Sequence, residues 1–398
     1  MSTILPRDYL RLRTRHILEL LDEDLPYIHV LIGPRQVGKS TAARQIAANL
    51  KIPFVMESGD SPVALGPDWI QLHWERAIEA ARGESALLIL DEIQKVSGWS
   101  ETLKALWDRN RLPGLKVLVL GSSALMVQHG LSESLAGRFL LHRFGHWNPS
   151  EMKDAFGMDL EDWFYYGGYP GAVRLRHRPE LWRGHIRDSL VETALARDVL
   201  QMQPIRKPTL LRNLFGLACL HPAEAISYTK MLGSLQDAGN TVTLAHYLEL
   251  LENAFLVTGL EAWRPGLQSR RGSSPKLVVR NNALAAALSG KIRQDLGTDR
   301  TWRGRMVENA VLAHLVQELD GTGAELRWWR DKHWEVDLVI RTPKGLWALE
   351  IKSGKPENPA GLREFGKRWP EAKLWTIGTG GIPFDEFFAL DPKSVFGL

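Results

Sequence analysis

A glycine-rich run near the start of the chain has the residue types and spacing that bind phosphate. Residues 33–40 are GPRQVGKS and match G-x-x-x-x-G-K-[ST], directly after an apolar segment and at the start of a helix-compatible one. Its two glycines allow a tight turn whose amides point inward, and the helix N-terminus adds partial positive charge. Lys39 would reach the β- and γ-phosphates, while the Ser40 hydroxyl would ligate Mg²⁺. We therefore predict a site for ATP and Mg²⁺, formed by Gly33, Pro34, Arg35, Gln36, Val37, Gly38, Lys39, Ser40, Thr41 and Asp91.

Two adjacent carboxylates end an apolar run further along the chain. The segment ALLILDEI places Asp91 and Glu92 at the C-terminal tip of a predicted buried strand, where an α/β sheet presents ligand chemistry. We expect Asp91 to hold the Mg²⁺ shell and Glu92 to polarise the attacking water. The glutamate favours a hydrolase over a passive nucleotide sensor. The alternative is that Glu92 is only the N-terminal acid of the next helix.

Further polar residues have the chemistry to act on the terminal phosphate. The strand KVLVLGSS ends in Ser122 and Ser123, and Ser122 is assigned as the sensor of the γ-phosphate or the lytic water. Arg138, in LAGRF, is a candidate arginine finger for its own nucleotide or a neighbour's. An ordinary salt bridge explains Arg138 equally well. Arg35 is a weaker candidate for the same role.

The C-terminal part of the chain carries a second pair of carboxylates. In WEVDLVIRTPKGLWALEIKSG two alternating strands flank TPKG, a sequence suited to a tight turn. Pairing of the first and last turn residues would place Asp337 opposite Glu350, with Cβ atoms about 5 Å apart. Lys352 follows on the same face. Carboxylates this close repel unless a cation neutralises them, so the pair predicts a site where Asp337 and Glu350 hold Mg²⁺ or Mn²⁺.

A metal ion at this hairpin could generate hydroxide and neutralise charge on a phosphodiester, with Lys352 orienting the water. Hydrolysis of a phosphodiester in this way is the reaction of a nuclease. Two alternatives stay open. The domain is a fold that has lost activity and serves as a structural or docking module, or the strand pair is a surface feature neutralised by Lys352.

The predicted elements divide the chain into four parts. Residues 27–145 alternate four apolar strands with helix-compatible segments, as in a parallel α/β sheet. Residues 207–265 predict three helices and then two short strands around FLVTGLEAW, the pattern of a winged helix. After SRRGSSPK we expect a helix, three strands, a helix and a strand. The prediction is an α/β multidomain protein with an ATPase core (1–150), a helical lid or linker (151–206), a winged helix (207–270) and a C-terminal α/β domain (271–398).

A winged helix commonly places a recognition helix in the major groove and its wing on phosphate. Here that helix would begin near Thr241. The wing is followed by basic residues suited to backbone contact with DNA, which are Arg264, Arg270, Arg271 and Lys276. The recognition helix lacks Arg or Asn at base-reading positions, so packing against protein is the alternative role.

Composition limits the class of protein. A chain of 398 residues is too long for one ordinary core, so several domains are expected. Cys219 is the only cysteine, which excludes an internal disulfide and fits a reducing compartment. No apolar run approaches the roughly 20 residues of a membrane span, and no signal peptide is expected. We expect a cytoplasmic protein with no membrane partner. The net charge of +4 permits DNA as a partner without requiring it.

Four segments in order, GPRQVGKST, LDEIQKVSGW, GSSALM and SLAGR, resemble prokaryotic AAA+-type ATPases whose C-terminal portion is a domain of unknown function. The resemblance covers nearly the whole chain. It implies an ATPase core of the additional-strand catalytic-glutamate type, a winged-helix middle and a nuclease-like end. One departure is VVRNNALAAAL, since such proteins have an Asp and a Gly close to Asn281 and Ala283.

The C-terminal carboxylates carry a second resemblance. Asp337, Glu350 and Lys352 have the D…E-x-K layout of PD-(D/E)xK, or restriction-endonuclease-like, nucleases. Glu308 in RMVENAVLAHL matches the helix acid of that fold. The resemblance implies that these four residues form the catalytic site of a metal-dependent deoxyribonuclease.

Together these expectations describe an ATP-hydrolysing DNA-processing enzyme, in which hydrolysis moves or gates DNA towards a nuclease site. An arginine finger supplied by a neighbour predicts a homo-oligomer such as a hexameric ring, with a monomeric switch as the alternative. One rival is a regulatory or signalling ATPase whose nuclease-like fold is inactive and only binds DNA or a partner. Another is a defence nuclease that nucleotide holds in check.

Overall fold

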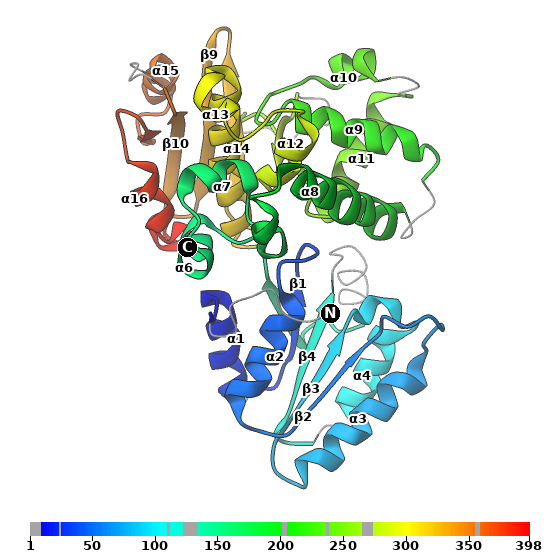
Figure 1. The fold of residues 1–398 in the computed structure, drawn as a ribbon. Coiled ribbons are helices and arrows are strands. Elements are labelled where there is room, and N and C mark those ends of the chain that lie inside the picture. Colours follow the sequence, from blue (N-terminus) through cyan, green and yellow to red (C-terminus); the bar gives the residue numbers. More distant parts are fainter. Residues whose placement is uncertain are drawn as a thin grey trace. The chain divides into compact units, whose positions relative to one another are not determined.

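The structure is a computed structural model that describes residues 9–23, 25–109, 112–121, 134–200, 205–235, 239–264, 274–354 and 359–398. The chain forms two compact units, Met1–His146 and Trp147–Leu398, which are described one at a time (Figure 1). None of the helices within these described ranges is long and apolar enough to cross a membrane.

The first unit is built on a five-stranded parallel sheet with the strand order β2-β3-β4-β1-β5. Helices α1 and α2 cover one face, and α3 and α4 cover the other (Figure 1). Its elements are α1 (Leu12–Asp22), β1 (Ile28–Ile32), α2 (Lys39–Leu50), β2 (Phe54–Ser58), α3 (Pro67–Ala81), β3 (Ala86–Asp91), a 3-10 turn (Ile93–Lys95), α4 (Trp99–Arg109), β4 (Leu115–Gly121) and β5 (Phe139–Arg143).

The four strands expected from the sequence are confirmed as β1 to β4, and β5 is an additional strand. Strands β1, β3 and β4 are almost entirely buried, which explains their continuous apolar sequences. The sequence of β5, FLLHR, is only half-buried because this strand lies at the edge of the sheet. Its shorter apolar run gave too weak a strand signal.

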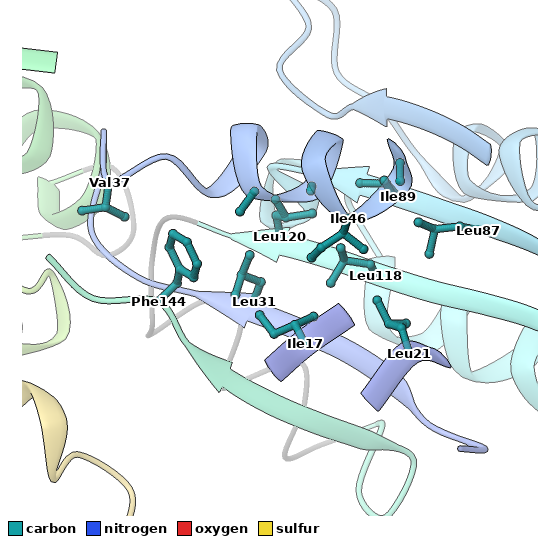
Figure 2. Packing of buried hydrophobic residues seen from close by; sticks show 13 residues of the cluster. Ile17, Leu21, Leu31, Val37, Ile46, Leu87, Ile89, Leu118, Leu120 and Phe144 are labelled. Atoms are coloured by element: carbon teal, nitrogen blue, oxygen red, sulfur yellow. The ribbon is translucent and has the colours of Figure 1, made fainter. Parts of the chain in front are cut away.

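A hydrophobic core joins α1 and α2 to the sheet. Figure 2 shows Ile17 of α1 beside Leu31 of β1, and Leu21 of α1 and Ile46 of α2 near Leu118 of β4. Each of these side chains is at most 2% exposed. Burying one such side chain stabilises the unit by about 1.5–3 kcal/mol. This core holds the start of α2, and with it the glycine-rich loop, against the ends of the strands.

The second unit begins with a helical region and a two-stranded sheet. Its helical segments up to residue 253 are α6 (Pro149–Phe156), α7 (Leu160–Tyr166), a 3-10 turn (Pro170–Leu175), α8 (Pro179–Gly184) with its helical continuations (His185–Val191 and Ala194–Leu200), α9 (Pro208–Leu220), α10 (Tyr228–Ser234) and α11 (Thr241–Asn253). The three helices expected between residues 207 and 254 are confirmed as α9, α10 and α11. Strand β6 (Val257–Leu260) pairs antiparallel with β7 (Lys276–Val279).

The pairing of β6 with β7 differs from the expectation that both short strands lie around FLVTGLEAW. Only β6 comes from that segment, and its partner KLVV follows the polar break SRRGSSPK. A four-residue strand that opens with a lysine carries little local signal, because strand pairing between distant residues is decided by tertiary contacts.

The C-terminal elements form a mixed four-stranded sheet with helices around it. The strand order is β11-β10-β9-β8, with β10 and β11 parallel and the other pairs antiparallel. The elements are α12 (Asn282–Leu288), α13 (Asp295–Thr298), α14 (Arg300–Glu318), β8 (Glu325–Asp331), β9 (Trp334–Thr342), β10 (Gly345–Lys352), α15 (Ala360–Arg368), β11 (Lys373–Gly378), α16 (Phe384–Ala389) and α17 (Pro392–Val395). The expected helix–three strands–helix–strand order is confirmed.

Candidate functional site

The glycine-rich loop connects the end of β1 to the start of α2. Gly38 precedes α2 with a φ of 93°, a left-handed conformation that glycine adopts without strain. A Cβ atom on Gly33 would lie 2.0 Å from the carbonyl oxygen of Phe144, so the loop can approach the segment after β5 only with glycine there. The two glycines of the motif therefore have different tasks, one of them conformational and the other steric.

Lys39 lies inside the loop rather than in solvent. Its side chain is buried, and Nζ donates to the carbonyl oxygens of Gly33 at 2.8 Å and Pro34 at 2.7 Å. These bonds hold a positive charge within a turn of backbone at a helix N-terminus. Such an arrangement fits the phosphates of a nucleotide, for which the ammonium group would exchange its carbonyl partners.

Ser40 and Asp91 form a hydrogen-bonded pair across the ends of two elements. Ser40 Oγ donates to Asp91 Oδ2 at 2.5 Å, and the backbone amide of Glu92 donates to Asp91 Oδ1 at 2.9 Å. Burial raises the pKa of Asp91, although the bond from Ser40 opposes the shift. A half-buried carboxylate beside a hydroxyl is a set of hard oxygen ligands for a Mg²⁺ ion.

Glu92 follows β3 in a left-handed backbone conformation with a φ of 51°, which is rare for a residue with a side chain. Its Oε2 accepts a 2.6 Å hydrogen bond from Nε2 of Gln94, which is buried in the next turn. Gln94 is not among the residues that the sequence predicts for this site. The only signal would have been its place two residues after the expected catalytic acid.

The other residues predicted for the nucleotide site differ in how far they are exposed to solvent. Arg35 and Thr41 are half-buried in the loop and in α2, whereas Gln36 is exposed and Val37 is buried. Strand β4 ends at Gly121, and the sensor candidate Ser122 lies outside the described residues.

Arg138 directly precedes β5, at the end of the strands opposite to the end from which the phosphate loop emerges. Its carbonyl oxygen accepts from the amide of Ile28, which begins β1, whereas the loop follows the end of β1. The strand between them spans about 13 Å. The guanidinium group forms two hydrogen bonds with Asp108, at 2.7 and 3.0 Å. The structure therefore separates Arg138 from the chain's own phosphate site. The arginine at the loop end of β5 is Arg143, whose register partner is Ile32.

The C-terminal carboxylates lie on the hairpin that the turn sequence predicts. Thr342 pairs with Gly345, and the register continues to Leu338 opposite Leu349. Beyond that pair, the Asp337 side chain makes the next contact between the two strands. Its Oδ2 accepts a hydrogen bond from the backbone amide of Ile351 at 2.8 Å. Glu350 Oε1 lies 2.7 Å from Lys352 Nζ. The expected hairpin and its register are confirmed.

A residue missed as part of this site lies at its centre. Lys276 Nζ is 2.7 Å from Glu308 Oε1, 3.1 Å from Glu335 Oε1 and 3.4 Å from Asp337 Oδ1. The side chain of Lys276 is 1% exposed. The expectation that Lys276 contacts DNA phosphate is therefore wrong, because its ammonium group is buried and ion-paired. The sequence carried little signal for this role, because the acidic partners of Lys276 lie at least 32 positions away along the chain.

The charges of this cluster depend on one another. Burial, with repulsion from Asp337, raises the pKa of Glu308 to about 8 and that of Glu350 to about 7. Burial alone would lower the pKa of Lys276, but attraction to Glu308, Asp337 and Glu335 outweighs it and raises the pKa. Lys276 is therefore held in its charged form.

The expected metal clamp at Asp337 and Glu350 has no support in this geometry. Within the described ranges, no group of three or more His, Cys, Asp or Glu side chains is arranged to hold a metal ion. The physical reason at Asp337 is that the Lys276 ammonium group already neutralises it.

Three parts of the chain match known protein families. Residues 26–152 match an AAA domain. The first unit carries an AAA-type P-loop ATPase domain. Residues 157–295 and 303–383 match two domains of unknown function, DUF8612 and DUF4143. No curated protein matches the chain.

Two solved structures are similar to much of this chain at low sequence identity. The Aeropyrum pernix Orc1 protein in complex with DNA is 13% identical, over 73% of this chain and 93% of that one, with a TM-score of 0.32. The Thermotoga maritima RuvB Holliday junction branch migration motor is 16% identical, over 70% and 94%, with a TM-score of 0.33. No conclusion is drawn from likeness at such low TM-scores.

Within the region that matches DUF8612, Asn281 stands near the place where an aspartate was expected. Its Oδ1 accepts from the amide of Ala283 at 3.1 Å, at the N-terminus of α12, and from the amide of Gly168 at 3.2 Å. An aspartate could accept the same two hydrogen bonds. The departure therefore preserves a helix cap and a link to the segment after α7, while it removes a buried charge.

Proposed function

We propose that this chain hydrolyses ATP in its AAA domain, at the loop that begins α2. The observation that carries the proposal is the pairing of Ser40 Oγ with Asp91 Oδ2 at 2.5 Å beside the enclosed ammonium group of Lys39. A hydroxyl and a half-buried carboxylate are suitable Mg²⁺ ligands, and Lys39 with the loop amides suits phosphate.

The roles of the residues follow from where they lie. Lys39 and the loop amides would bind the β- and γ-phosphates and stabilise charge that develops during transfer. Ser40 and Asp91 would hold Mg²⁺, which supplies neutralisation of charge on the phosphates. Glu92 would accept a proton from, or orient, the attacking water. Gln94 restricts the Glu92 carboxylate to one orientation.

Purified full-length protein tests this proposal through phosphate release from ATP with Mg²⁺, compared with the variant Lys39→Ala. Loss of binding and turnover in the variant supports the assignment. Full turnover by Lys39→Ala would contradict it. An exposed lysine of the same unit, Lys104, provides the matched control variant Lys104→Ala.

For the C-terminal domain we propose binding of DNA or a protein partner without cleavage. Asp337, Glu350, Lys352 and the helix acid Glu308 are the residues for which the sequence predicts a nuclease-like site. However, the buried Lys276 ammonium group supports neutralisation of Asp337 and Glu308 by the chain itself rather than by a metal ion. This favours an inactive nuclease-like domain over the nuclease that the carboxylates alone suggested.

Helices α9, α10 and α11 with strands β6 and β7 support a winged-helix connector, whose contact with DNA is also proposed. The four-domain division, with boundaries near residues 150, 206 and 270, remains a proposal as well. End-labelled duplex, single-stranded and branched DNA with Mn²⁺ tests the binding function. We expect retarded mobility and intact strands. Cleavage by the wild type that disappears in Asp337→Ala would contradict the proposal and support a nuclease function instead.

An oligomer is proposed because Arg138 has no access to the chain's own phosphate site. If this arginine completes a site, the site must belong to a second copy, as in a ring. Size measurement by light scattering with and without ATP tests this step. A monomer under both conditions would leave Arg138 as a surface residue paired with Asp108.

A further inference from the structure

Carboxylates from two elements converge on one buried ammonium group supplied by a third. Lys276 belongs to β7, Glu308 to α14, and Glu335 and Asp337 to β9. The side chains of Lys276 and Asp337 are 1% and 12% exposed, so water screens this pair little, whereas Glu308 and Glu335 are 21% and 31% exposed. Removal of the ammonium group would leave Glu308 and Asp337 without this counter-ion, whereas Glu335 would keep its hydrogen bond from Arg330 Nε at 3.0 Å.

A fourth carboxylate, that of Glu350, has one oxygen that could still bind a cation. Glu350 is 9% exposed, and its Oε2 is buried without a hydrogen-bond partner among the described residues. Its other oxygen, Oε1, pairs with Lys352 at 2.7 Å. Glu350 lies between Leu349, whose register partner is Leu338, and Ile351, whose amide donates to Asp337 Oδ2, so Glu350 is next to Asp337 across the strand pair. Carboxylate oxygens gathered around one point are the ligands that Mg²⁺ and Mn²⁺ prefer.

We propose that Lys276 is the fixed cation of this cluster and takes the place at which a divalent ion would otherwise neutralise Glu308, Asp337 and Glu350. An ammonium group and a divalent ion repel strongly at such short range, so the wild-type cluster excludes Mg²⁺ and Mn²⁺. The inference rests on the proposed binding role of the C-terminal domain and deepens it. A cluster that takes no divalent ion has no means of generating metal-bound hydroxide.

The test measures Mn²⁺ binding by electron paramagnetic resonance on full-length, nucleotide-free protein. The variant Lys276→Met removes the charge and keeps an unbranched side chain. Lys352→Met is the matched control, because it removes a lysine of the same cluster but leaves Lys276 in place. Asp337→Asn, alone or combined with Lys276→Met, identifies the Mn²⁺ ion that this cluster holds.

Wild type and Lys352→Met should bind no Mn²⁺ that depends on Asp337. Lys276→Met should gain a Mn²⁺ site at least about tenfold tighter than any in the wild type, and the double variant should lose it. The melting temperature of Lys276→Met should fall and then recover with saturating Mn²⁺.

Two outcomes would overturn the inference. The first is Mn²⁺ binding by the wild type that Asp337→Asn removes, and this comparison decides the question even if Lys276→Met fails to fold. The second is a folded Lys276→Met protein without a new Mn²⁺ site. DNA cleavage tests the proposed binding role and is measured separately, so the failure of one proposal is distinguished from the failure of the other.

Discussion

Ser40 Oγ lies 2.5 Å from Asp91 Oδ2, although 51 residues separate the two along the chain. The parallel sheet creates this proximity, because α2 starts beyond the end of β1 and Asp91 ends β3 at the same edge. The two side chains proposed to hold Mg²⁺ therefore lie within hydrogen-bond distance of each other.

Replacing Asp91 by asparagine should weaken the use of Mg²⁺. The amide still contacts Ser40 but no longer supplies a negative charge, so ATP turnover should fall by about 10–100-fold at limiting Mg²⁺. A Mg²⁺ titration of ATP hydrolysis measures the change. If the Mg²⁺ dependence of Asp91→Asn matches that of the wild type, Asp91 has no part in the metal site.

Gln94 should act through Glu92. The 2.6 Å hydrogen bond restricts the carboxylate, so Gln94→Ala should lower kcat by about tenfold or more while ATP affinity stays unchanged. Lys95→Ala is the control, since Lys95 is adjacent and pairs with Asp60 instead. A parallel loss of ATP affinity in Gln94→Ala would indicate a purely structural role.

We expect Arg138 to contribute to ATP hydrolysis only at the phosphate site of a second copy of the chain. We expect Arg138→Ala to keep ATP binding and lose turnover, and the specific activity of the wild type to rise with protein concentration. Mixtures with Glu92→Gln should then deviate from simple dilution. If the specific activity is independent of protein concentration and the mixtures follow simple dilution, the proposal of an active site shared between copies is wrong.

Acid should destabilise the first unit through a histidine pair. His29 Nδ1 and His142 Nε2 lie 3.0 Å apart, and burial lowers the pKa of His29 to about 4 and that of His142 to about 3. The unfolded chain, with histidine pKa values near 6.5, binds more protons below that pH. Stability that is fully present above about pH 6.5 is therefore lost as the pH falls towards 4.

The loss from His29 alone is about 2 kcal/mol at pH 5. Urea unfolding at pH 7.5 and pH 5 measures it, with a His29→Gln/His142→Gln double variant as the comparison. The double variant should lose less stability on acidification. An equal loss in both proteins would mean that these histidines do not carry the acid sensitivity.

Features that depend on neighbouring residues were predictable from the sequence. The turn TPKG determines the β9–β10 register, and the glycine-rich motif with its flanking strand and helix locates the phosphate loop. In both cases the physical signal is local, since turn geometry and apolar periodicity act over a few residues.

Features that depend on distant contacts were not predictable. Lys276 looked like a basic residue beside a wing, and only the folded chain shows that Glu308, 32 positions away, is its partner. Arg138 had the right residue type for a finger, yet the addition of β5 to the sheet edge places it beside the start of β1. Neither charge pairing nor edge-strand position has a local sequence signature.

The most direct test of ATP hydrolysis compares wild type with Glu92→Gln for ATP affinity and for phosphate release in the same preparation. The account predicts that both proteins bind ATP with Mg²⁺ equally well and that only the wild type releases phosphate, with turnover of the variant reduced by at least about 100-fold. Equal phosphate release by both proteins would contradict it.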